Sequence, residues 1–115
     1  MDDAVKEIDS LVYSTLEKIR AKGGTIKKGI NEVTKVLERS QAKLVVYAAD
    51  VSPKEIVMHL PLLAKDQNVP CIEVKAKTDL GKAVGMNIGA SAIAVTDAGE
   101  EAHSLEDLIS KIKSI

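Results

Sequence analysis

The chain has 115 residues, a formal net charge of -1, 45% hydrophobic and 29% charged residues, and this composition excludes a disordered or low-complexity protein. The overall charge argues weakly against generic nucleic-acid binding, because such domains are usually basic throughout. We expect neither a membrane segment nor a secretory leader, since apolar runs are short and the start MDDAVKEIDS is acidic. The single cysteine, Cys71, excludes an intrachain disulfide and favours a reducing compartment: cytoplasm, or the nucleus or nucleolus of a eukaryote.

The first half of the chain is predicted to alternate between helices and strands. A helix that stops at Gly23-Gly24 precedes a short strand at 25–27, and Gly29 suits the N-cap of a second helix that ends near Arg39. The β-rich segment 44–48 follows as the second strand. The first helix is indicated by apolar residues at helical spacing, namely Ile8, Leu11, Val12, Leu16 and Ile19.

A third helix is indicated by the segment SPKE, which has the pattern of a capped helix start. Ser52 can act as the cap, Pro53 suits the first helical position, and Glu55 can close a capping box. Pro61 lacks a backbone N–H and is expected to break or bend this helix before it resumes.

The last part of the chain repeats the alternation. A third strand at 71–74 precedes a short helix at 78–85, which Gly85 can cap at its C-terminus, and a fourth strand covers 92–95. The motif SLED at 104–107 predicts a capped final helix. Its inward residues are expected to be Leu108, Ile109 and Ile112.

This order of elements predicts an α/β protein, a three-layer α/β/α sandwich formed by one domain over residues 1–115. Charge is distributed unevenly along it. Between positions 22 and 43, six basic residues stand against two acidic ones, whereas acidic residues collect near both ends of the chain. The fold is therefore expected to carry a positive side, which could meet phosphate, and a negative side.

The second helix is predicted to present a polar face in its first turns. At about 100° per residue, Asn31, Glu32 and Lys35 project together to the side opposite the apolar residues. An ordinary solvated surface would look the same. An amide, a carboxylate and an ammonium on adjacent turns can, however, hydrogen bond to the edge of a guanine. The Gly29 end, with Lys27 and Lys28 beside it, suits a phosphate group, because helix starts offer backbone N–H groups.

The motifs KKGxNExTK and AxDVxPxEIVxHLPLL give the chain a specific family resemblance. Residues 24–85 closely resemble, without gaps, the kink-turn RNA-binding proteins typified by the archaeal seven-Ae ribosomal protein and its eukaryotic spliceosomal and nucleolar relatives. The similarity continues through ASAIAV and more weakly to the C-terminus. The resemblance implies a three-layer α/β/α sandwich whose four-stranded sheet is mixed.

The resemblance also implies roles for individual residues. Lys28 would lie near the RNA backbone, and the residues that would meet the tandem sheared G·A pairs are Gly29, Asn31, Glu32 and Lys35. A base flipped out of the internal loop would be surrounded by Ile56, Lys77, Ile88, Gly89 and Ala90, although Ile88, Gly89 and Ala90 could also form an ordinary loop. The chain has only two aromatic residues, which favours recognition by shape and an aliphatic pocket over stacking.

Two departures from the family pattern concern serines. Ser52 stands where many relatives have an acidic residue that helps to line the flipped-base pocket, and we interpret it as a helix cap worth about 1 kcal/mol. Ser40 replaces a glycine that is usual at the end of the second helix. If the backbone there is left-handed, serine costs on the order of 1 kcal/mol.

The function expected from these residues and the resemblance is non-catalytic recognition of kink-turn RNA. The RNAs implied are ribosomal RNA and box C/D and H/ACA guide RNAs, with ribonuclease P RNA as a further candidate; ribonucleoprotein core proteins are the implied protein partners. The free protein is expected to be a monomer without membrane contact. A protein-interaction module on the same fold is the alternative, but it would not require Asn31, Glu32 and Lys35.

An enzyme is the remaining class of function. His59, His103 and Cys71 lack the spacing of metal ligands, and residues 81–89, GKAVGMNIG, match neither a dinucleotide-binding nor a P-loop pattern. His59 is interpreted as a packed or capping histidine. We therefore expect no catalytic residue, no cofactor and no metal.

Overall fold

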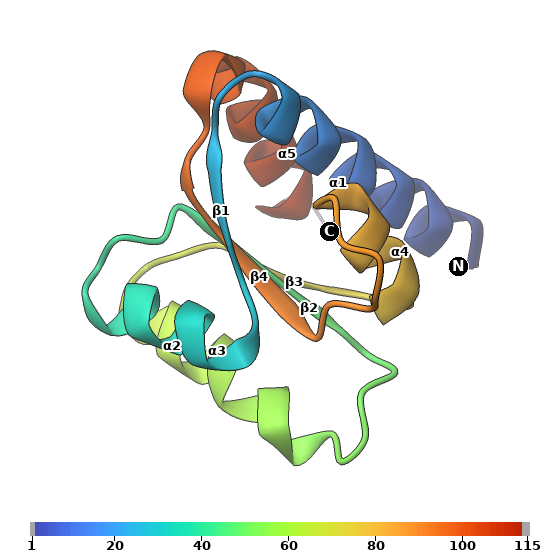
Figure 1. Ribbon diagram of the computed structural model, residues 1–115, viewed down its shortest axis with the longest axis vertical. Coiled ribbons are helices and arrows are strands. Elements are labelled where there is room, and N and C mark those ends of the chain that lie inside the picture. The colour runs from blue at the N-terminus through green and yellow to red at the C-terminus, as the bar shows by residue number, and fades with distance from the viewer. Residues whose placement is uncertain (1, 114–115) are drawn as a thin grey trace.

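The computed structural model, which describes residues 2–113, is an α/β sandwich (Figure 1). Over these residues no helix combines the length and the apolar character that spanning a lipid bilayer requires. In chain order the elements are α1 (Asp2–Ala21), β1 (Thr25–Lys28), α2 (Ile30–Glu38), β2 (Leu44–Ala48), α3 (Glu55–Asp66), β3 (Cys71–Val74), α4 (Lys77–Ala83), β4 (Ala92–Asp97), the 3-10 turn η1 (Gly99–Glu101) and α5 (Ala102–Lys113).

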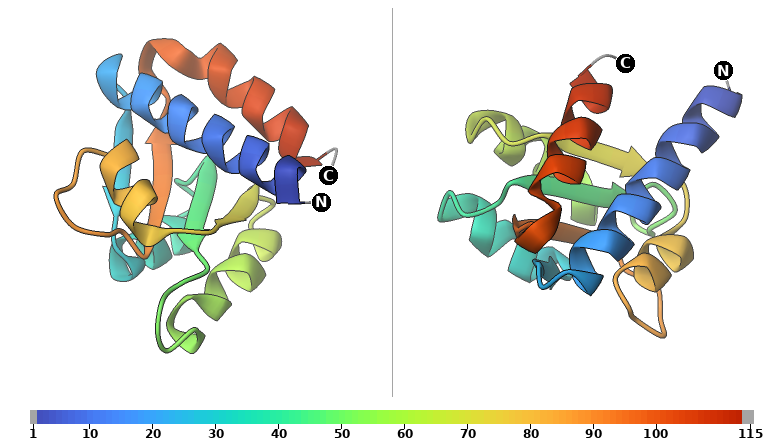
Figure 2. Two further views of the ribbon diagram at one scale, coloured as in Figure 1. Left: turned by 90° about the vertical axis from the view of Figure 1, so that its right-hand side faces the viewer. Right: turned by 90° about the horizontal axis from the view of Figure 1, so that it is seen from above.

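The four strands form one mixed sheet in the order β1-β4-β2-β3. β4 is antiparallel to both β1 and β2, whereas β2 and β3 are parallel. Helices α1, α4 and α5 cover one face of the sheet, and α2 and α3 cover the other (Figures 1 and 2). The predicted three-layer α/β/α sandwich is confirmed, and so is the mixed sheet that the family resemblance implied.

The core lies on both faces of the central strands β2 and β4. These strands are apolar along nearly their whole length rather than alternating, as is typical of strands that are covered on both sides. Val33, Val36 and Leu37 of α2 are buried against one face of the sheet. Leu16 and Ile19 of α1 are fully buried on the other side. The polar side of α2 is thereby directed to solvent.

The predicted start of α3 was wrong. Ser52 does not cap this helix: the cap position is Lys54, which makes no side-chain capping bond, and the helix begins only at Glu55. The reason is local, since backbone carbonyls of the preceding turn already accept the first N–H groups, with Ile56 N donating to Pro53 O at 3.3 Å. Pro61 lies inside a single helix and does not interrupt it.

The predicted start of the final helix was also wrong. Ser104 lies within α5, which begins at Ala102 directly after η1. Its hydroxyl donates to the Glu101 carboxylate, with the Ser104 Oγ to Glu101 Oε1 distance at 2.9 Å, instead of capping the helix. Leu108 is fully buried as predicted. Ile109 and Ile112 are partly buried against the core.

Ser40 has a left-handed backbone, with φ at 57°, at the position where the family resemblance implied a glycine. Ser40→Gly is therefore expected to exceed Ser40→Ala in free energy of unfolding by about 1 kcal/mol, because alanine keeps the strain of a Cβ in this region. Both variants lose the same hydrogen bond, from Ser40 Oγ to Gln67 Oε1 at 2.6 Å, so the comparison isolates the backbone. Urea denaturation measures the difference. Equal stability of the two variants would contradict the prediction.

Candidate nucleic-acid interface

The loops that carry the candidate residues gather at one end of the sheet. Because β4 runs opposite to β1 and β2, its start lies beside their ends, and the parallel strand β3 also ends there (Figure 1). Backbone hydrogen bonds join these segments: Gly29 N donates to Ala92 O at 2.9 Å and Ala48 N donates to Ser91 O at 2.9 Å. The sheet topology therefore brings together residues that are 43 and 63 positions apart in the chain.

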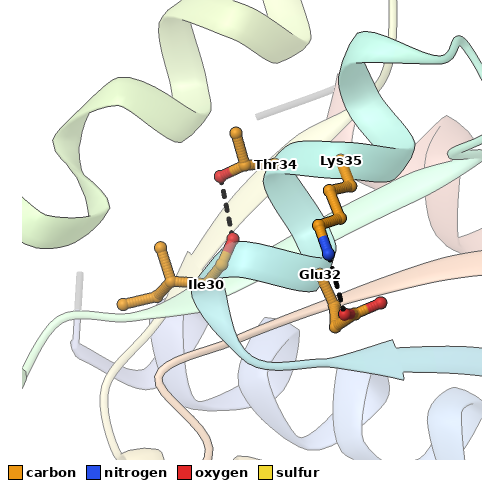
Figure 3. A network of polar contacts seen from close by, with 4 residues as sticks. All are labelled: Ile30, Glu32, Thr34 and Lys35. Carbon is orange, nitrogen blue, oxygen red and sulfur yellow. Dashed lines mark hydrogen bonds and ion pairs between the residues drawn. The ribbon is translucent and has the colours of Figure 1, made fainter.

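The polar face of α2 lies where the helical spacing placed it. Asn31, Glu32 and Lys35 are exposed, and the apolar residues of the helix are buried on the opposite side. Lys35 Nζ lies 3.7 Å from Glu32 Oε1, and the two side chains are 57% and 51% exposed (Figure 3). An ion pair this exposed contributes little to stability, so both groups are free to exchange this contact for a ligand.

Gly29 has a backbone conformation that suits glycine alone. Its φ of 100° and ψ of 148° lie in a region that residues with a side chain avoid. Its N–H is used by the sheet, because it donates to Ala92 O. A Cβ built on Gly29 would meet no atom within 4 Å, so the backbone is open to the outside at this point. The start of α2 is thus accessible to an approaching ligand, although the N–H of Gly29 itself is not free.

The first turns of α2 and α3 form the two walls of an open groove of about 840 Å³. Ile56, which is 40% exposed, lies in the second wall. Sequence reasoning missed the other two residues of that wall, Glu55 and His59, because no local pattern shows that α3 begins beside α2. The lining residues are Lys28, Gly29, Ile30, Asn31, Glu32, Glu55, Ile56 and His59.

His59 links the two walls and is exposed, so of the two interpretations, packed or capping, the packed one was wrong. Its ring is exposed, and its Nε2 lies 2.9 Å from Thr34 Oγ1. The Thr34 hydroxyl donates to Ile30 O at 2.8 Å, and so it accepts the hydrogen bond from His59 Nε2–H (Figure 3 shows the Thr34 contact with Ile30). This chain of hydrogen bonds joins α3 to the first turn of α2.

A second cluster lies at the same end of the sheet, where the loop before β4 packs on α4. Ala90 N donates to Lys77 O at 3.0 Å, and a Cβ on Gly89 would lie only 2.9 Å from Lys77 Cγ. Ile88 is 72% exposed, whereas Ala90 is buried. The structure therefore brings Lys77, Ile88, Gly89 and Ala90 together. Ile56 lies instead in the groove between α2 and α3.

Burial raises the pKa of the Cys71 thiol and of the Tyr47 hydroxyl. Burial, reinforced by the nearby Glu73 carboxylate, raises the pKa of the Cys71 thiol to about 12, so it is protonated near neutral pH. Burial likewise raises the pKa of Tyr47 to about 12, again with Glu73 as a further cause. Over the residues that the structure describes, no group of three or more His, Cys, Asp or Glu could hold a metal ion.

Two comparisons with known proteins bear on the family and the fold of the chain. The model of the ribosomal protein L7Ae/L30e/S12e/Gadd45 family matches residues 11–104. Among solved structures, the fold is similar to the Giardia lamblia 15.5kD RNA binding protein, with a TM-score of 0.88 and 28% sequence identity. That match covers 94% of this chain and 89% of the other.

Proposed function

The chain belongs to the ribosomal protein L7Ae/L30e/S12e/Gadd45 family, and on this basis we propose that it is an RNA-binding protein that recognises kink-turn motifs. The observation that carries the proposal is the exposed set Asn31, Glu32 and Lys35 beside the open start of α2. Support also comes from the similarity to a Giardia lamblia protein that is itself described as RNA binding.

The α2 face is proposed to bind the tandem sheared G·A pairs. Lys35 can donate to guanine O6 or N7, Glu32 can accept from guanine N–H groups, and the Asn31 amide can do both. Lys28 would contact the phosphate backbone next to Gly29. A regular A-form helix hides its base edges in a deep, narrow groove, so these side chains need a bent or opened RNA.

The cluster on α4 and the loop before β4 is proposed to hold an extruded base. Ile88 offers a large exposed apolar surface and Lys77 a flexible ammonium, while Gly89 keeps the backbone without a side chain at this point. Ile56 would contribute from the groove. Such a pocket reads a flipped base by shape and apolar contact, which suits a chain with few aromatic residues.

By binding only the kinked conformer, the protein would shift the folding equilibrium of its RNA toward that conformer. The proposed targets are ribosomal RNA and box C/D and H/ACA guide RNAs, with ribonuclease P RNA as a further candidate, and the bent RNA would then bind further core proteins. No catalytic step is part of this function. The compartment it implies is the cytoplasm, or the nucleus or nucleolus of a eukaryote.

Gel-shift titrations with a kink-turn duplex and a straight duplex of equal length and similar base composition test the proposal. We expect the kink-turn to be bound at least about a hundredfold more tightly, because specific nucleic-acid complexes exceed non-specific ones by this margin or more. Equal affinity for the two RNAs would refute it. Loss of the preference when each sheared G·A pair is replaced by a G·C pair is the matched RNA control.

A further inference from the structure

The backbone of Lys77 joins three segments that lie far apart in the sequence. Its N–H donates to Asp50 Oδ1 at 2.8 Å, and its carbonyl oxygen accepts the N–H of Ala90 at 3.0 Å. Asp50 lies in the loop after β2, Lys77 is the first residue of α4, and Ala90 lies in the loop before β4. The Asp50 carboxylate is therefore one hydrogen bond away from Lys77 and two away from the loop that contains Ile88.

Helix α4 and this loop are in close contact, with no space for an additional side chain at Gly81. A Cβ on Gly81 would collide with the carbonyl oxygen of Ile88 and would lie 3.2 Å from Ala90 N. On the other side, the side chain of Lys77 packs against Gly89. Residues 88–90 therefore follow the position of the start of α4, because they contact it on both of its first two turns.

The segment that leads into α4 is held by two carboxylates of different character. Asp9 of α1 is only 7% exposed and accepts the N–H of Lys75 through Oδ2 at 3.0 Å. The hydroxyl of Tyr13, 3.5 Å from Ala76 O, adds a long contact from the same helix. Asp50, in the loop after β2, accepts the N–H of Lys77 and is exposed. The buried Asp9 thus holds Lys75 to α1, while the exposed Asp50 holds Lys77, the first residue of α4.

We propose that Asp50 is a positioning residue for RNA recognition, which holds Lys77 and residues 88–90 in the geometry that receives the extruded base. This inference rests on the proposed function. It assigns Asp50 no contact with RNA. A carboxylate beside a polyanion is electrostatically unfavourable, so an acidic residue at this end of the sheet opposes binding unless its positional effect is larger. The two effects have opposite signs, and substitutions can therefore separate them.

Asp50→Ala removes both the charge and the hydrogen-bond acceptor, whereas Asp50→Asn removes only the charge and keeps an acceptor oxygen. We expect Asp50→Ala to bind the kink-turn about tenfold more weakly. The Lys77 N–H loses a charge-assisted hydrogen-bond partner, so Lys77 and the loop 88–90 that contacts it are no longer held in one position. Asp50→Asn is expected to bind at least as tightly as the wild type. Asp66→Ala removes an exposed carboxylate near the other end of the sheet and should leave affinity unchanged.

The readout that separates positioning from general destabilisation is a kink-turn that is abasic at the extruded nucleotide. On this RNA, Asp50→Ala should bind at least as tightly as the wild type, since there is no base to position and only the unfavourable charge is removed. In the free protein, Asp50→Ala should also increase the rate of amide hydrogen exchange at Lys77 and Ala90, and Asp50→Asn should not.

The outcomes distinguish the two proposals. A wild-type protein that does not prefer the kink-turn to the straight duplex overturns the proposed function together with this inference. A wild type that does prefer it, with Asp50→Ala binding as tightly as wild type or more tightly, overturns the positioning role alone. An equal loss for Asp50→Ala on the intact and the abasic RNA also overturns the positioning role, because the effect would then not depend on the extruded base.

Discussion

Leu37→Ala should lower the free energy of unfolding by about 2–5 kcal/mol, the range for leucines truncated in a closely packed core. Leu37 is fully buried on the inner side of α2, between the helix and the sheet. Because Asn31, Glu32 and Lys35 lie on the opposite side, the folded fraction should keep its RNA affinity to within about twofold. Urea denaturation and a kink-turn titration at low temperature measure the two quantities separately.

The control for this prediction is Glu38→Ala in the same helix. Glu38 is exposed, and its truncation should change stability by no more than about 0.5 kcal/mol. A loss of less than 1 kcal/mol for Leu37→Ala would contradict the packing of α2 described above. A large loss of RNA affinity in the folded variant would show instead that the two faces of the helix are coupled.

Lys35→Ala should weaken kink-turn binding by about 1–3 kcal/mol and relax the requirement for the paired guanine, since the ammonium is proposed to read a base edge. The stability of the free protein should hardly change, because the lost Glu32–Lys35 pair is exposed and such pairs are worth about 0.2–0.5 kcal/mol on a helix. Fluorescence titrations with the intact kink-turn and with G-to-A substitutions in its tandem pairs measure both effects.

Two further lysines provide matched controls for Lys35. Lys28 is proposed to contact phosphate, so Lys28→Ala should weaken binding to all RNAs alike and reduce the slope of log affinity against log salt by about 1. Lys111, exposed on α5 in the other helical layer, should be neutral. Equal losses for Lys35→Ala and Lys28→Ala on every RNA would refute the division between base reading and backbone contact.

Periodicity and turn chemistry placed most of the elements. β2 and β3 have the residues predicted for them, and Gly85, with φ at 80°, follows α4 as expected for a helix C-terminus. The errors fell at the starts of α3 and α5, where serines match the capping pattern. A capping pattern shows only which bonds a serine could make. Before α3, backbone carbonyls of the turn accept the N–H groups at the start of the helix. Before α5, the 3-10 turn η1 leads directly into the helix, so Ser104 lies inside it. Neither feature can be recognised from a local motif.

The sequence by itself determined which side of α2 faces solvent, because a helix with apolar residues on one side must bury that side against the sheet. It therefore determined that Asn31, Glu32 and Lys35 leave the helix together. Only the tertiary structure decided what lies beside them: the second wall with Glu55 and His59, and the support of residues 88–90 by Lys77 and Asp50. His59 and Thr34 are 25 positions apart, Asp50 and Lys77 are 27 apart, and Lys77 and Ala90 are 13 apart. Strand order and register, rather than any local pattern, create these contacts.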